Sequence, residues 1–497
     1  MWPVVDTGEI TTRFGAPGYR DALCGFIGHR LTGTVESRES GLVVRFAPGA
    51  LAIGPAPADL TGPEIATRQV RGGGRVYRPG EAVFAWLGQT PRSGYASGMD
   101  LRQDAHAMSD DLVALRRALH QVPELGLDLP RTQETVLQAL DGLPLEISTG
   151  TGLSSVTAVL RGQGGDGDVV LLRGDMDALP VTENTGAAFS SRHEGRMHAC
   201  GHDLHTAGLV GAARLLSAHR DRLAGDVVFM FQPGEEGHDG AGHMIAEGVL
   251  DAAGRPVAEA YGLHVVSAMI PRGRFVSRPG PIMAAADGLF VRVLGAGGHG
   301  SRPHVALDPV PAACEMVTAL QTMVTRRFSV FDPVVVTVGT FHAGTQRNII
   351  PPEARFEATI RSFSKEARER VAELAVPLCR DIAAAHGLEA EVTYSPEYPV
   401  TVNDPAGHEF VAETVREVFG EERFTEAPDP VTGSEDFSRV LDRVPGAFVF
   451  LGATFADDPD SAPYNHSPEA SFDDSVVADG AALLASLAAR RLSGARA

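Results

Sequence analysis

The chain has 497 residues, of which 43% are hydrophobic and 21% are charged, a composition typical of a soluble globular protein of two to four domains. Its 43 Lys and Arg against 63 Asp and Glu give a net charge of −20, which argues against nucleic acid and anionic membrane surfaces as partners. No stretch approaches the roughly eighteen consecutive apolar residues of a membrane-spanning helix.

The cysteines and the N-terminus indicate the compartment. Four widely spaced cysteines (Cys24, Cys200, Cys314 and Cys379) form no disulfide framework, so a reducing cytoplasm is expected. The first residues, MWPVVDTGEITTRFG, lack a basic start followed by an apolar core, and therefore predict no secretory signal.

Residues 1–98 differ from the rest of the chain, being rich in Gly, Pro and Arg and containing no catalytic cluster. Short strand-like runs at 41–46, 50–53 and 75–77 are separated by turn residues. The segment is either a small β-rich appended module or an N-terminal extension of a complete protein, since Met99 stands just before the first strong helix. Both alternatives stay open.

The first strong helix is expected from about Ser109, which is suited to be its N-cap. Leu112, Leu115 and Leu119 recur there at helical spacing. A second amphipathic helix is expected over 131–140.

Three short apolar runs, at 169–173, 227–231 and 260–265, predict buried strands. In open α/β sheets ligands bind beyond the carboxyl ends of strands. Metal-competent side chains stand at or near the ends of these runs: Asp175, Asp177, Glu235, Glu236 and His264. Adjacent glutamates suit a division of labour in which one binds a metal and the other accepts a proton from water. Solvated turn carboxylates are the alternative interpretation.

Residues 197–206 read MHACGHDLHT, which places one cysteine, three histidines and one aspartate within ten residues. Cys200 and His202 can reach one metal ion such as zinc, manganese, cobalt or nickel. A buried thiol beside surface histidines is the alternative. The metal-competent residues at the three strand ends favour the metal site.

From about residue 282 to 400 the pattern changes to the order β-α-β-β-α-β. The expected strands lie at 289–294, 334–340, 355–361 and 389–394, and the helices at 309–326 and 367–386. This order suggests a ferredoxin-like α+β module, inserted because metal-competent residues resume afterwards. The last section contains a helix at 408–419, a strand at 447–451 and a closing helix at 476–491.

Together these pieces resemble the M20 metallopeptidase superfamily, and within it the amidohydrolase branch of hippurate hydrolases and auxin–amino acid conjugate hydrolases. The matching pieces run in the same order from about Ser109 to the C-terminus: RRALH at 116–120, PELG at 123–126, GDMDALP at 174–180, MHACGHDLHT at 197–206, FQP at 231–233 with Glu235 and Glu236, GLH at 262–264, GHG at 298–300, GSEDF at 433–437 and HSP at 466–468.

The resemblance implies an α/β, metal-dependent exopeptidase-like catalytic domain with an inserted ferredoxin-like α+β lid or dimerisation domain. The expected division is 1–98 for the N-terminal β-rich segment, 108–282 for the first part of the catalytic domain, 283–400 for the inserted domain and 401–497 for the second catalytic part. It also implies one or two divalent ions, Mn²⁺ or Zn²⁺, with Co²⁺ or Ni²⁺ possible.

The resemblance also assigns roles to individual residues. The implied metal ligands are Cys200, His202, Glu236, His264 and His466. Glu235 is the implied general base, and Asp177 matches a supporting carboxylate. Asp175 stands where other branches have a metal-binding histidine, so a ligand role does not carry over to it. Residues expected to support the site or the fold near it are His120, Glu124, His198, Asp203, His205, Glu435 and Asp436.

In the inserted domain, His299 or His304 is the candidate donor to the oxyanion of the tetrahedral intermediate. In similar enzymes such a histidine reaches an active site, often across a dimer, so a homodimer is expected. Asn348 and Arg361 resemble the family's contacts to the substrate carboxylate, and a guanidinium suits a carboxylate. Arg361 can equally be a surface strand residue, and each histidine a plain loop residue.

The expected reaction is hydrolysis of an N-acyl amino acid to a carboxylate and a free amino acid. A metallo-carboxypeptidase or dipeptidase acting on short peptides is the near alternative. A binding protein that keeps metal for structure is a third hypothesis, but Glu235 and all five ligand positions are present.

Overall fold

The computed structural model describes residues 99–493 and, before them, seven strands. These strands are β1 (Val4–Asp6), β2 (Thr11–Arg13), β3 (Leu31–Ser37), β4 (Gly41–Phe46), β5 (Gly49–Ile53), β6 (Ala66–Val70) and β7 (Gly73–Tyr77). The chain divides into two compact units, Met1–Gly94 and Tyr95–Ala497. Cys24 lies outside the described residues.

The first unit is β-rich, as the sequence predicts. Five of its strands form an antiparallel sheet in the order β2-β1-β5-β4-β3, and β6 pairs with β7 as a separate antiparallel hairpin. The three strand-like runs of the sequence fall within β4, β5 and β7.

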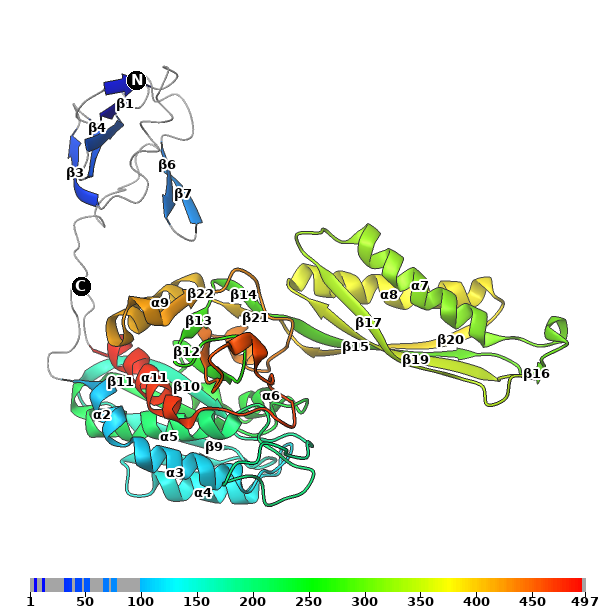
Figure 1. Ribbon diagram of the computed structural model, residues 1–497, viewed down its shortest axis with the longest axis horizontal. Helices are drawn as coiled ribbons and strands as arrows, with labels where there is room; N and C mark the ends of the chain where they lie inside the picture. The colour runs from blue at the N-terminus through cyan, green and yellow to red at the C-terminus, as the bar shows by residue number, and fades with distance from the viewer. Residues whose placement is uncertain are drawn as a thin grey trace. The chain divides into compact units, whose positions relative to one another are not determined.

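The second unit is built on an eight-stranded sheet (Figure 1). Its strands, in spatial order, are β22 (Phe424–Glu426), β13 (Phe275–Ser277), β23 (Gly446–Gly452), β12 (Glu259–Val266), β10 (Gly165–Asp175), β11 (Ala224–Gln232), β9 (Val156–Arg161) and β8 (Leu145–Thr149). The four central strands, β23 to β11, run parallel, so their carboxyl ends share one edge of the sheet.

Alternation along the strands gives each face of this sheet its own core. In β10, Val170 and Leu172 face one apolar cluster, whereas Val169 and Leu171 face the other. The first cluster is covered by α2 (Leu101–Ala107), α3 (Ser109–His120), α4 (Pro130–Leu140), α5 (His202–Ala218), α9 (Pro405–Phe419) and α11 (Val477–Arg491). The second is covered by α6 (Gly240–Ala246) and α10 (Ser438–Leu441).

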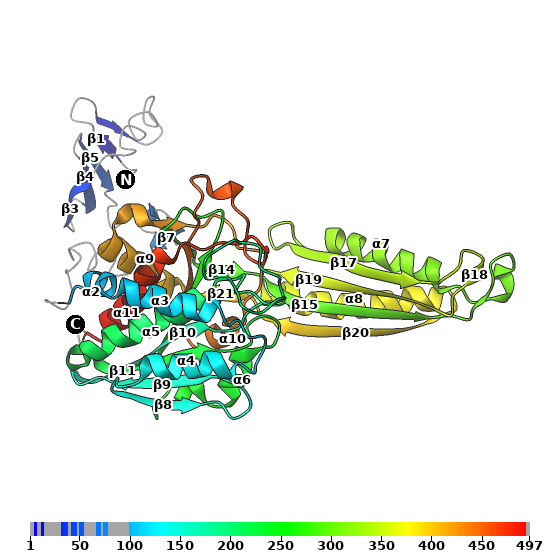
Figure 2. The ribbon, with the colours of Figure 1, turned by 60° about the horizontal axis from the view of Figure 1, so that its bottom comes forward.

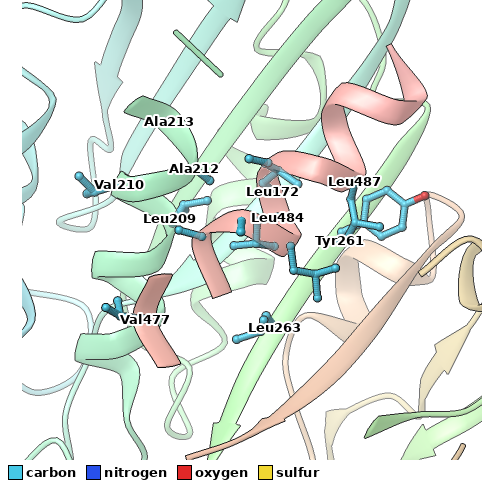
Figure 3. Packing of buried hydrophobic residues seen from close by; sticks show 14 of the residues in the cluster. Leu172, Leu209, Val210, Ala212, Ala213, Tyr261, Leu263, Val477, Leu484 and Leu487 are labelled. Carbon is cyan, nitrogen blue, oxygen red and sulfur yellow. The ribbon is translucent and has the colours of Figure 1, made fainter. Parts of the chain in front are cut away.

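Helices α5 and α11 form the centre of the larger core (Figure 3). Leu209 of α5 and Leu484 of α11 gather with Leu172 of β10 and Leu263 of β12. The two helices approach closely because small residues face each other: a Cβ added at Gly211 would lie 2.7 Å from the Cβ of Ala481. A helix that is apolar on nearly all sides must be buried in this way.

The start of the helical region corrects one expectation. Ser109 is not an N-cap: it is the first residue of α3, with Met108 at the cap and no side-chain cap hydrogen bond. The reason is that α2, which the sequence analysis did not foresee, already runs up to Ala107, and its own N-cap is Asp100, whose side chain accepts from Gln103 N–H.

The expected β-α-β-β-α-β order is present in the structure. It consists of β15 (Ala285–Leu294), α7 (Pro309–Arg327), β17 (Val334–Ala343), β19 (Glu353–Ser362), α8 (Lys365–Ala385) and β20 (Glu389–Tyr398). The strands form an antiparallel sheet in the order β17-β19-β15-β20. Both helices cover one face and enclose a separate core that includes Leu289, Met316 and Phe356 (Figure 2).

Two small strand pairs stand at the ends of this module. One joins β14 (Gly280–Met283) to β21 (Thr401–Asn403), where the chain enters and leaves the module. The other joins β16 (Gly298–His299) to β18 (Ile349–Ile350) at the opposite end. Among residues 99–493, none of the helices is long and apolar enough to cross a membrane.

The contact between β12 and β23 gives a test of the sheet. A Cβ added at Gly446 would lie 1.8 Å from the carbonyl oxygen of Ala260, an atom that cannot rotate away. We expect Gly446→Ala to force the strands apart and to lower the free energy of unfolding by about 1–3 kcal/mol. The measurement is the thermal unfolding midpoint.

The control is Gly480→Ala in α11, where the nearest atoms to an added Cβ lie 3.8 Å away. This variant should unfold at or above the wild-type midpoint, because Ala favours a helix interior over Gly. A wild-type midpoint for Gly446→Ala would contradict the close approach of the strands.

Candidate metal centre and active site

The central stretch of the sequence lies at the amino end of α5, against the carboxyl edge of the parallel strands. Gly201 precedes the helix with a positive φ of 84°. A Cβ there would lie 2.4 Å from Val265 Cγ2 of β12, so glycine allows the turn to approach that strand. Cys200 and His202, on either side of this glycine, are thereby brought beside His264 of β12.

Five residues from distant parts of the chain meet at this edge. Cys200 Sγ lies 3.4 Å from His264 Nε2 and 3.3 Å from His466 Nε2. Glu236 Oε1 lies 3.2 Å from His466 Nε2 and 4.0 Å from His202 Nε2. These are the five residues that the sequence resemblance implies as metal ligands: Cys200, His202, Glu236, His264 and His466.

The five residues form two overlapping groups. In one, the ligand atoms of Cys200, His202 and His264 lie within 4.8 Å of one another, and in the other those of Cys200, Glu236 and His466 do. Cys200 belongs to both groups. A single thiolate is therefore placed where it can serve two neighbouring ions.

The protonation of the histidines suits metal binding. His202 Nδ1 lies 2.9 Å from the carbonyl oxygen of Asp177, and His264 Nδ1 lies 2.7 Å from that of Val265, so each Nδ1 carries the proton. The Nε2 atoms then present lone pairs, and His202 Nε2 is buried without a hydrogen-bond partner among the described residues. Such an orphaned imidazole nitrogen, in a set of sulfur, nitrogen and oxygen donors, fits a divalent metal ion.

Asp177 holds the turn that carries the two glutamates. Its carboxylate oxygens accept hydrogen bonds from the backbone N–H groups of Glu235 and Glu236, each at 3.0 Å. Left-handed glycines flank the pair, Gly234 at φ 72° and Gly237 at φ 80°. Asp177 thus positions both glutamates together beside the histidine–cysteine cluster.

Glu235 lies next to the cluster and is only 7% exposed. Burial raises its pKa well above the ordinary value, and the neighbouring carboxylates of Glu435 and Glu236 raise it further. A carboxylate of raised pKa holds a proton more strongly than an ordinary one, which suits a group that must accept a proton during a reaction.

Asp175, Glu435 and Asp436 converge on a fully buried guanidinium. Arg173 donates to Asp175 Oδ2 at 2.5 Å, to Glu435 Oε1 at 2.8 Å and to Asp436 Oδ1 at 3.1 Å. Asp175 also lies 2.5 Å from His205 Nδ1. The sequence analysis missed Arg173, although one signal was available: an arginine inside an otherwise apolar strand.

A second buried ion pair supports the start of α5. Arg116 Nε and His120 Nδ1 each lie 2.7 Å from Asp203 Oδ2, directly after His202. Asp203 has its pKa held well below the ordinary value by Arg116 and His120, against the opposing effect of burial. This anchors the helix end that carries His202.

The four residues expected in the inserted module make no hydrogen bond or ion pair with this cluster among the residues that the structure describes. His299 and Asn348 are exposed and lie side by side at the β16–β18 pair, where Gly300 N–H donates to Asn348 O at 2.8 Å. β15 carries the chain about 30 Å before it reaches this end of the module.

Arg361 lies on β19 opposite Ala286, near the end of the module that joins the rest of the unit. Its guanidinium donates to Ile360 O at 3.2 Å. His304 is exposed in the loop after β16.

The two hydrogen bonds by which the Asp177 carboxylate holds the N–H groups of Glu235 and Glu236, called here the Asp177 clamp, allow a test of the candidate metal centre. Asp177→Asn keeps the size of the side chain but presents an NH₂ group toward one of two N–H donors. We expect the affinity for Zn²⁺ or Mn²⁺ to fall by about 10–100-fold, as for other residues that orient metal ligands. Metal titration of metal-free protein measures this. Asp141→Asn, on the exposed end of α4, is the control and should bind as wild type does; equal affinities of the two variants would contradict the clamp.

Known proteins are similar to this chain over most of its length. The chain is 36% identical to thermostable carboxypeptidase 1 of Saccharolobus solfataricus over 394 residues, which span 78% of this chain and 98% of that protein. It is 37% identical to an N-acyl-L-amino acid amidohydrolase of Geobacillus stearothermophilus, over 62% of this chain and 82% of that protein.

A solved structure extends the agreement to the fold. The crystal structure of a dinuclear metal binding peptidase of the M20 family from Bacillus subtilis matches with a TM-score of 0.67 and 32% identity, over 78% of this chain and 99% of that one. The model of the peptidase family M20/M25/M40 matches residues 171–490. The resemblance and the α/β fold class expected from the motifs are confirmed, and the chain belongs to the peptidase family M20/M25/M40.

Proposed function

We propose that the chain is a metal-dependent amidohydrolase that cleaves the amide bond of N-acyl amino acids. The observation that carries this proposal is the buried Glu235, held by the Asp177 clamp beside a cluster of one cysteine, three histidines and Glu236. The name of the Geobacillus stearothermophilus relative, an N-acyl-L-amino acid amidohydrolase, supports the substrate class.

The proposed ligands of one or two divalent ions, Mn²⁺ or Zn²⁺ with Co²⁺ or Ni²⁺ possible, are Cys200, His202, Glu236, His264 and His466. The two overlapping groups that share Cys200 support a two-ion site. When bound, such ions polarise an amide carbonyl and lower the pKa of a water molecule.

Glu235 is the proposed general base. Its carboxylate takes one proton from the attacking water as the new C–O bond forms, and returns that proton to the amine nitrogen as the C–N bond breaks. The raised pKa of Glu235 suits both steps, because the group must gain and lose the proton in each cycle.

The inserted module, residues 283–400, is proposed to complete the site of another copy. His299 would donate to the oxyanion, and Asn348 and Arg361 would bind the substrate carboxylate. β15 separates His299 and Asn348 from the end of the module that joins their own catalytic domain. This separation supports a homodimer in which each copy provides these two residues to the active site of the other. The remaining catalytic parts are then 108–282 and 401–497, which both contribute strands to the eight-stranded sheet.

A metallo-carboxypeptidase is the second candidate function, because the Saccharolobus solfataricus relative carries that name. Both reactions release a free amino acid, and they differ in whether the acyl side is an aryl or alkyl group or another amino acid. The cytoplasm is the proposed compartment, since Cys200, Cys314 and Cys379 are all free thiols.

Hydrolysis of a small substrate panel tests the proposed reaction. Hippurate, N-acetyl amino acids, an indole-acetyl amino acid and a dipeptide are incubated with the protein and Mn²⁺ or Zn²⁺, and free amino acid is measured. We expect release from the N-acyl amino acids, with kcat lowered by about 10²–10⁴-fold in Glu235→Gln, which cannot accept the proton.

Glu194→Gln, an exposed glutamate, is the matched control and should keep wild-type kcat. Turnover of the dipeptide alone would favour the carboxypeptidase. Full activity of Glu235→Gln would contradict the assignment of the base.

Removal of metal tests the dependence on divalent ions. We expect a chelator to abolish turnover and added Mn²⁺ or Zn²⁺ to restore it, because carbonyl polarisation and water activation both need the ion. Metal content is measured alongside the rate, and undiminished turnover by protein shown to be metal-free would contradict the proposal.

A further inference from the structure

Where the inserted module joins the rest of the unit, a β-bulge in β20 brings Tyr398 against residues 235–239, called here the catalytic turn because they begin with the proposed base Glu235. β15 and β20 pair with a register shift: Ala286 lies opposite Tyr398, but Asp287 lies opposite Pro396. The extra residue, Glu397, donates its N–H to Asp287 Oδ1 at 3.1 Å. Bulges of this kind re-aim the side chains that follow them.

Tyr398 is 7% exposed, and its hydroxyl makes two hydrogen bonds to the turn that carries the proposed base. It donates to the carbonyl oxygen of Glu235 at 2.8 Å and accepts from Asp239 N–H at 3.1 Å. The hydroxyl of Tyr398, the last residue of β20, thus joins both ends of the segment 235–239. Because β20 is the strand by which the chain leaves the module, it is called the return strand below.

This segment contains backbone conformations that need support. Gly237 and Asp239 both have positive φ, 80° and 54°, and for Asp239 that region is unfavourable. Arg439 binds the Asp239 carboxylate through Nε and Nη2, each at 3.0 Å, and its Nη2 also donates to Glu397 O at 2.7 Å. The turn and the return strand are therefore connected twice, at Tyr398 and through Arg439.

We propose that Tyr398 is a positioning residue, whose hydroxyl holds the 235–239 turn so that Glu235 and Glu236 face the metal centre. Asp177 fixes the N–H groups of the two glutamates from the sheet side, and Tyr398 fixes the carbonyl of Glu235 from the module side. The orientation of the base then depends on the strand by which the inserted module returns. The kinetic consequence rests on the proposed function.

The chain offers a matched control four residues earlier on the same strand. The Tyr394 hydroxyl is partly buried and donates to Asp287 Oδ2 at 2.7 Å. Asp287 is bound in addition by Arg368, so this hydrogen bond stays inside the module. Tyr398→Phe and Tyr394→Phe each remove one hydroxyl from β20, but only the first frees the catalytic turn.

The kinetic experiment compares the two variants on the best substrate of the panel. We expect Tyr398→Phe to lower kcat by about 10-fold or more, with KM changed less than about twofold, because the base is misplaced while substrate binding is kept. Tyr394→Phe should keep kcat within about twofold, although it also loses a hydrogen bond of the tyrosine hydroxyl. An unchanged kcat in Tyr398→Phe, or equal losses in the two variants, would overturn the proposal.

A second measurement does not depend on turnover. The N–H groups of Glu235 and Glu236 donate to Asp177, and that of Gly237 donates to the carbonyl oxygen of Glu235, so none of the three donates to Tyr398. Hydrogen–deuterium exchange at these N–H groups should be faster in Tyr398→Phe than in wild type and Tyr394→Phe. Unchanged exchange overturns the positioning role. Faster exchange with a wild-type protein that hydrolyses no substrate would support the positioning role and reject the proposed function.

Discussion

The burial of one guanidinium among several carboxylates is the interaction on which the rest of the structure depends. Arg173 lies inside β10 and contacts Asp175 on its own strand, with Glu435 and Asp436 from the far end of the chain. Buried carboxylates are costly unless they are paired, so removing Arg173 would take from Asp175, Glu435 and Asp436 the positive charge that they share. The ion cluster therefore joins the two sequence halves of the eight-stranded sheet directly behind the metal centre.

The acidic residues around this cluster differ in the groups that their carboxylates contact. Asp175 pairs with Arg173 and His205, and Asp177 accepts two backbone N–H groups. Among the described residues the Glu235 carboxylate makes no hydrogen bond or ion pair, and burial together with the neighbouring carboxylates raises its pKa. Two glutamates adjacent in sequence thus acquire different chemistry, because Glu236 lies against His466 whereas Glu235 does not.

Much of this could be predicted from the sequence. The apolar runs at 169–173, 227–231 and 260–265 lie within β10, β11 and β12, and the module shows the expected order of strands and helices. Glu236 and His264 meet at one edge because parallel strands place their carboxyl ends together, and the Gly201 turn brings Cys200 and His202 to the same edge. The arginine at the end of the apolar run 169–173 could have drawn attention to Arg173, but not to its partners, and α2 and Tyr398 were not foreseen. The roles of Arg173 and Tyr398 arise from contacts with residues far along the chain.

The sequence by itself determined the family and most of the helices and strands after residue 108, because hydrophobic periodicity and short motifs are local properties. Only the tertiary structure decided which carboxylates face the cluster, which pair with Arg173, and that His299 and Asn348 lie at the outer end of the module. These outcomes depend on strand register, on the bulge before Tyr398 and on the length of β15. Such through-space relations are set by packing, and the spacing of residues along the chain does not contain them.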